Sequence, residues 1–292
     1  MNNKTELSHH KLIMAQWDKY KRMLSRKLGK IPSEWLILSD YCLDDPHKNS
    51  CATFTISPMQ DLGELKRILQ KSLPRDFKDI TNVPKETLRF IKEYKYFFSL
   101  SIIFEDIKQS EIIADLREAV EYILKHYTDM PDKMRRNIVQ FREYLKKGNK
   151  NCKVLKNLVL VSILVSHIIE FLTIKHSAQN IRWISDRDAI LDISDGVILD
   201  YIRIITSKLI RGRKKLPKLG IGIGNKHAKI FDFDAFIRYP DIITGAVASL
   251  DYYRNGVRKI KHFDLLTNAI FKNRNILILL SRKGKWDLIK YK

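Results

Sequence analysis

The stretch Trp35–Leu36–Ile37–Leu38–Ser39–Asp40 is an apolar segment that ends on a carboxylate. A polar turn follows from Tyr41 to Asn49, and a second segment of apolar and β-branched residues runs from Cys51 to Ile56. Two such segments joined by turn residues predict a β-hairpin. Asp is common in turns, but an Asp at the end of a buried strand needs a partner or a metal ion. Both interpretations of Asp40 are open at this point.

The composition favours a basic protein with a sizeable core. The chain has 292 residues, of which 45% are hydrophobic, and its net charge is +21. This length allows one large domain or two small ones. A charge of this size favours an anionic partner, either nucleic acid or an acidic membrane surface. A basic protein without such a partner is the alternative.

The cysteines and the N-terminus indicate a cytoplasmic protein. Cys42, Cys51 and Cys152 form no CxxC pair and have no histidine at zinc-site spacing, so we expect neither a disulfide framework nor a zinc site. Residues 1–11 are polar and do not resemble a signal peptide.

Hydrophobic periodicity and turn residues predict the other elements. Helices are expected at 8–28, 61–73, 85–96, 110–147 in two pieces, 152–176, 190–209 and 242–253, the last one opened by Tyr239–Pro240–Asp241. Strands are expected at 97–104, 181–185 and 219–223, with a further one at 229–233. The order predicts an α/β fold with a mixed sheet that starts antiparallel.

The most apolar run, from Val154 to Ile174, is the place where a membrane span would be sought. Polar residues interrupt it, among them Lys156, His167 and Glu170. We therefore expect a buried helix at the centre of a soluble protein rather than a membrane anchor, and a membrane partner is not favoured.

Three aspartates share the property of lying at element ends. Asp40 ends the first strand, Asp186 follows the strand 181–185, and Asp241 lies at the start of a predicted helix. Carboxylates that converge at one sheet edge repel each other unless a divalent cation neutralises them. Oxygen ligands suit Mg²⁺ or Mn²⁺, and two such ions catalyse phosphodiester cleavage.

Four short motifs, in order, resemble the ribonuclease-H-like superfamily, and within it a widespread group of small bacterial proteins of unassigned activity. They are WLILSD at Asp40, Asp76–Phe77–Lys78 before a helix and a strand, WISDRD at Asp186, and a helix with Asp241 four residues before Gly245. The resemblance implies a ribonuclease-H-like mixed sheet with flanking helices and a helical insertion. Within it, we expect a basic helix at 1–30, the main domain at 31–260 with its insert at about 110–176, and a basic extension at 261–292.

The resemblance also implies a site. Asp40, Asp76, Asp186 and Asp241 would bind Mg²⁺ or Mn²⁺, and Lys78 would orient the scissile phosphate or a water molecule. Asp188 is an alternative to Asp186, while Glu64 and Glu105 are alternatives to Asp76.

These features predict a metal-dependent nuclease that acts on RNA or DNA. A basic cluster would contact the phosphate backbone, although a solvated helix end explains it as well; its members are Lys208, Arg211, Arg213, Lys214 and Lys215. The second hypothesis is an inactive nucleic-acid-binding or effector protein, acting in phage defence, and it is favoured by Tyr41 in a position where the family usually has Glu. A third is a peripheral membrane protein. A protein partner or a homo-oligomer is compatible with each of them.

Overall fold

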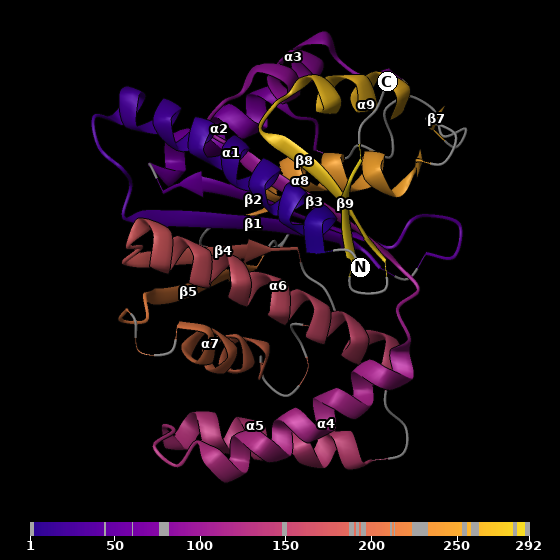
Figure 1. Ribbon diagram of the computed structural model, residues 1–292. Coiled ribbons are helices and arrows are strands. Elements are labelled where there is room, and N and C mark those ends of the chain that lie inside the picture. Colours follow the sequence, from indigo (N-terminus) through magenta and orange to yellow (C-terminus); the bar gives the residue numbers. More distant parts are fainter. Residues whose placement is uncertain are drawn as a thin grey trace. The chain divides into compact units, whose positions relative to one another are not determined.

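The computed structural model divides the chain into two compact units, which are described separately (Figure 1). The sheet unit comprises Met1–Ile107, Asn180–Asp186 and Leu219–Lys292, and the helical unit comprises Lys108–Gln179 and Arg187–Lys218. The structure describes residues 3–43, 45–59, 61–75, 82–147, 151–186, 190, 193, 197–210, 212, 214–223, 233–252, 256–257, 263–282 and 285–289.

A mixed seven-stranded sheet forms the centre of the sheet unit, in the order β5-β4-β1-β2-β3-β8-β9. Its strands are β1 (Glu34–Cys42), β2 (Cys51–Pro58), β3 (Phe98–Glu105), β4 (Asn180–Ser185), β5 (Lys218–Ile223), β8 (Ile276–Arg282) and β9 (Lys285–Leu288). The predicted hairpin is confirmed, because β1 and β2 pair antiparallel and β3 continues the meander. β4 lies parallel to β1, and β8 lies parallel to β3. The predicted α/β class with a mixed sheet is confirmed.

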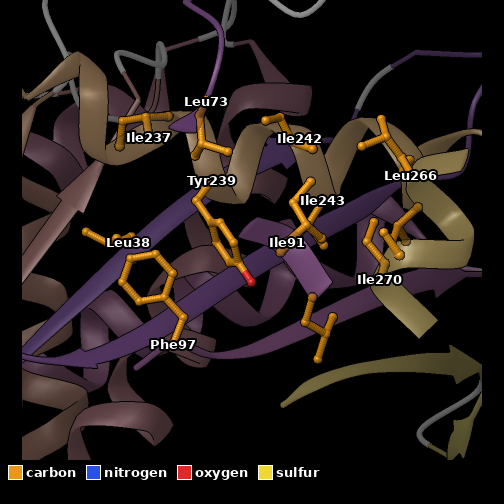
Figure 2. Packing of buried hydrophobic residues seen from close by; sticks show 14 of the residues in the cluster. Leu38, Leu73, Ile91, Phe97, Ile237, Tyr239, Ile242, Ile243, Leu266 and Ile270 are labelled. Carbon is orange, nitrogen blue, oxygen red and sulfur yellow. The ribbon is translucent and has the colours of Figure 1, made fainter. Parts of the chain in front are cut away.

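Helix α8 (Asp234–Ala248) packs on one face of the sheet, against β1, β2 and β3. Strand periodicity places Leu36, Leu38 and Asp40 on this face, since alternate residues of a strand point to the same side. Tyr239 of α8 packs edge-on against Phe97, with ring centroids 4.7 Å apart, and Figure 2 shows both rings beside Leu38. Helices α2 (Leu62–Ser72), α3 (Lys85–Glu93) and α9 (Phe263–Lys272) complete this core.

Helix α1 (Asn3–Leu28) contacts the other face of the sheet. Trp17 and Tyr20 are buried, as the helical spacing of apolar residues predicts, and the ring of Trp17 lies 4.9 Å from that of Phe98 on β3. The hydroxyl of Tyr20 donates to the carbonyl of Tyr96 at 2.7 Å. The buried aromatic stripe of α1 is therefore part of the core.

The helical unit consists of α4 (Gln109–His126), α5 (Asp132–Lys146), α6 (Cys152–His176) and α7 (Val197–Ile210). Helix α6 packs against α4 and α7. In the described part of the chain, α6 alone has the length and composition to cross a membrane, and 61% of its most apolar window is buried. This burial agrees with the prediction of a buried helix.

Several boundaries differ from the sequence-based prediction. Helix α1 begins at Asn3 rather than at residue 8, and α8 ends at Ala248 rather than at residue 253. Strand β1 continues past Asp40 to Cys42, and α7 begins at Val197 rather than at residue 190. Helix α8 begins at Asp234, so Pro240 lies inside it and not in its first turn. Proline favours the first turn because its missing N–H is not needed there. Here the burial of Phe236, Ile237 and Tyr239 outweighs the hydrogen bond that Pro240 removes.

The C-terminal segment also contributes to the sheet. The residues expected as a basic extension, 261–292, include α9, β8 and β9, and β8 is hydrogen-bonded to β3. A two-stranded ribbon, β6 (Leu250–Asp251) with β7 (Gly256–Val257), follows α8. The possible strand at 229–233 lies mostly outside the described residues.

Candidate active site

Asp40 and Asp186 are neighbours because β1 and β4 run parallel and in register. The ladder ends with Ser39 opposite Ser185, and the next residue in each chain segment is an aspartate. Both carboxylates therefore lie at the same, carboxyl-terminal level of the sheet. Sequence reasoning placed each at the end of a strand, and the parallel pairing brings them together.

Asp241 reaches the same place from α8. The hydroxyl of Thr244 donates to the backbone carbonyl of Asp40 at 3.3 Å, so the Thr244 side of α8 lies against β1. Asp241 is three residues before Thr244, and residues at this spacing share a helix face. The helix thus directs Asp241 toward the end of β1.

The charges of Asp186 and Asp241 act on the Asp40 carboxyl. Burial raises the pKa of the Asp40 carboxyl well above its ordinary value, and the negative charges of Asp241 and Asp186 raise it further. Hydrogen bonds from Thr244 and from the backbone N–H of Tyr41 lower the pKa of Asp40 in part. Asp40 is 8% exposed, Asp241 is half-buried and Asp186 is exposed, so the group extends from the core to the surface.

A carboxylate group of this kind has the donor chemistry for a hard divalent cation. As the side chains stand, however, no three His, Cys, Asp or Glu residues in the described part of the chain are close enough to form a metal site. The three aspartates are therefore coupled by charge without being gathered into a ligand set. A cation that draws them together would remove the repulsion that Asp40 experiences.

Several predicted site residues lie outside the described residues. These are Asp76, Lys78, Asp188, Arg211 and Arg213.

The two alternatives to Asp76 lie elsewhere. Glu64 is exposed on α2. Glu105 forms an ion pair with Arg282 on the neighbouring strand β8. It lies on β3, two strands from β1, which is about 10 Å across a sheet. Neither joins the aspartates of β1 and α8.

Tyr41 belongs to a polar network that the sequence did not predict. Its side chain is on the sheet face opposite to Asp40, because successive residues of a strand alternate. Ser185 donates to the Tyr41 hydroxyl at 3.1 Å, and Trp183 donates to the Ser39 hydroxyl at 2.8 Å. Ser39 and Tyr41 are hydrogen-bonded to each other. The network joins β1 to β4 next to the two aspartates and fixes their register.

Asn49 is a second residue that sequence reasoning missed. It is buried in the turn between β1 and β2, and its side-chain amide donates to the carbonyls of Val247 and Leu250 at 3.0 and 2.6 Å. Its backbone N–H donates to the carbonyl of Ala248 at 2.8 Å. Asn49 therefore ties the end of α8 to the hairpin that bears Asp40. The polar composition of this turn, with Asp, Pro, His, Lys and Asn, was the visible signal, but it indicates a turn and not this contact.

The described members of the basic cluster lie in the helical unit. Lys208 is exposed on α7, and its ammonium group is 4.9 Å from the ring centroid of Tyr122 on α4. Lys214 and Lys215 are exposed in the segment between α7 and β5. These three cations remain candidates for phosphate contacts.

Comparisons with known proteins do not extend these observations: no family model, curated protein or solved structure matches the chain. The assignment of a function therefore rests on the geometry.

Proposed function

We propose that this protein is a cytoplasmic, metal-dependent nuclease of the ribonuclease-H-like type that hydrolyses phosphodiester bonds in RNA or DNA. The observation that carries the proposal is the placement of Asp40 and Asp186 after the paired residues Ser39 and Ser185 of two parallel strands, with the Thr244 face of α8, which also bears Asp241, hydrogen-bonded to Asp40. An antiparallel meander of β1, β2 and β3, with β4 parallel to β1, supports the ribonuclease-H-like assignment.

Asp40, Asp186 and Asp241 would hold Mg²⁺ or Mn²⁺, because oxygen-only ligand sets suit these ions. When bound, such ions supply a nucleophile from water and stabilise the leaving oxygen. Asp76 and Lys78 complete the proposed site, as a fourth ligand and as a group that orients the phosphate.

Two features of the chain favour this site: the fixed position of α8 and the exposure of Asp186. Thr244 and Asn49 fix α8 on the hairpin, so the separation of Asp241 from Asp40 is set by buried hydrogen bonds. Asp186 is exposed, so a metal ion bound to it would be accessible to a polyanion from solvent. The net charge of +21 attracts that polyanion over long range.

The test is a cleavage assay on single-stranded, duplex and hybrid substrates, with Mg²⁺, with Mn²⁺ and with a chelator. We expect Asp40→Ala and Asp241→Ala each to lower the rate by roughly 100-fold or more, because each removes a ligand of the catalytic ion. Asp18→Asn, on the exposed side of α1, is the matched control and should cleave like the wild type. Thermal unfolding of each variant checks the fold. Wild-type rates for both alanine variants would refute the proposal.

The second candidate is an effector that keeps the fold and binds nucleic acid without cutting it, acting in phage defence. Tyr41 favours this candidate, because it occupies the position where a Glu is usual in the resembled family. Its hydroxyl is hydrogen-bonded to Ser39 and Ser185. Titration with Mn²⁺, followed by calorimetry, separates the two candidates. Heat of binding that Asp40→Ala abolishes supports the nuclease, and its absence in the wild type supports the effector.

A further inference from the structure

The helical unit carries two open pockets that meet at one residue, Leu216. The first, called the aromatic pocket, has a volume of about 320 Å³ and lies between the α4–α5 turn and α7; its lining includes His126, Tyr127, Met130 and Arg203. The second, called the lysine pocket, has a volume of about 390 Å³ and lies at the C-terminal end of α6; its lining includes Ala178, Lys214, Lys215 and Lys218. Volumes of this size suit small ligands or single groups of a polymer.

The aromatic pocket adjoins a pair of tilted rings on α4, next to a lysine of α7. The rings of His126 and Tyr122 are 4.4 Å apart, and Lys208 lies 4.9 Å from the centroid of Tyr122. The Tyr122 side chain is 48% exposed, one of the few large apolar side chains that the described surface presents. An exposed ring next to a lysine ammonium group is suited to stack on a planar base.

The lysine pocket has a different chemistry. Lys214, Lys215 and Lys218 are exposed around a floor formed by Ala178, Leu216 and Pro217. Three cations within five residues match the repeating phosphates of a nucleic-acid strand. Since Leu216 lines both pockets, the cationic and the aromatic surfaces are adjacent.

We propose that the helical unit binds an unpaired strand of nucleic acid, with bases stacked on Tyr122 and His126 or inserted in the aromatic pocket, and with phosphates on the lysine pocket. Only unpaired bases expose the faces that aromatic side chains contact, because a duplex hides them. This inference rests on the proposed nucleic-acid partner and specifies its form.

Fluorescence anisotropy tests the inference, using labelled oligouridylate and oligothymidylate about 20 nucleotides long and a duplex of the same length. The buffer contains a chelator, so that binding is measured without cleavage. We expect tighter binding of the single strands. Tyr122→Ser should weaken it about 5- to 150-fold, the effect of removing one base–aromatic stack. Tyr122→Phe retains the ring and should bind like the wild type.

The lysines have their own variant and control. The double variant Lys214→Ala with Lys215→Ala should weaken binding and reduce the salt slope by about 1.4, at about 0.7 for each phosphate that is no longer neutralised. Lys153→Ala removes an exposed lysine at the other end of α6, roughly 35 Å away by helix rise, and should change neither quantity.

The outcomes separate this inference from the nuclease proposal. Preferential single-strand binding that Tyr122→Ser weakens supports the inference even if the protein never cleaves. A protein that cleaves, but whose Tyr122→Ser and lysine variants bind like Lys153→Ala, overturns this inference alone. Equal affinity for the duplex also overturns it. No binding to any of the three probes overturns this inference, while the nuclease proposal is decided separately by the cleavage assay with Mg²⁺ or Mn²⁺.

Discussion

At the scale of single residues, Asp40 shows the conflict between stability and function. Its carboxyl is buried and lies near two other carboxylates, so its ionised form is disfavoured in the folded chain. A residue that costs folding free energy in this way is a candidate for function. Thr244 and the backbone at Tyr41 offset part of this cost by donating hydrogen bonds.

Replacing Asp40 by Asn should therefore stabilise the protein in a metal-free buffer. Because folding raises the pKa of Asp40, the folded state binds the proton more tightly, and stability falls as pH rises from the ordinary Asp range to the raised pKa. The gain from Asp40→Asn should be about 0.5–2 kcal/mol at neutral pH and should vanish below about pH 4.

Thermal melts at both pH values measure this gain, at about 2–4 °C per kcal/mol. Asp18→Asn is the exposed control and should not shift the melting temperature. A lower melting temperature for Asp40→Asn at neutral pH would contradict the prediction, because it would mean that the fold depends on the ionised carboxylate.

At the scale of elements, close approach of β5 to β4 depends on one glycine. A Cβ at Gly222 would lie 3.1 Å from Cγ1 of Ile184 and 3.3 Å from the ring of Phe233. Ile184 is fully buried, so a shift of its side chain would disturb the packing around it. A Cβ at Gly220 would meet only Arg182, at 3.9 Å. The two glycines of β5 therefore have different roles, although the sequence shows them as a simple alternation.

Gly222→Ala should lower the free energy of unfolding by about 1–3 kcal/mol through overpacking. Gly220→Ala, the matched control on the same strand, should change it by at most about 0.5 kcal/mol. Urea unfolding of both variants measures the difference. Equal urea midpoints for the two variants would contradict the prediction, because β5 would then have shifted enough to accommodate the added methyl group.

At the scale of the whole molecule, the net charge of +21 should dominate association with nucleic acid. Each lysine or arginine that contacts a phosphate releases counterions, so affinity falls as salt rises. With about five contacts to a single strand, affinity should fall about 100-fold between about 50 and 200 mM salt. Anisotropy titrations over this range measure the slope. A flat response would mean that phosphate contacts do not drive binding.

Much of the fold could be predicted from local patterns. The hairpin from Trp35 to Ile56 and the helix from Cys152 to His176 were found because their periodicity and turn residues are unambiguous. The start of α8 was wrong because Pro240 signals a first turn locally, while burial of the preceding turns decides the helix. The Tyr41 network was not predictable, since it joins residues of β1 and β4 that are 144 positions apart.

The sequence alone determined the class of the fold, the basic charge and the three aspartates as candidates, because these follow from composition and short-range spacing. Only the tertiary structure decided that Asp40, Asp186 and Asp241 lie at one end of the sheet, without forming a ligand set as their side chains stand. Their placement depends on the parallel register of β1 with β4 and on the hydrogen bonds by which Thr244 and Asn49 hold α8 against the hairpin. Both are contacts between segments that are far apart in the sequence, and their free energy comes from burial and hydrogen bonds. Local sequence patterns do not predict such contacts.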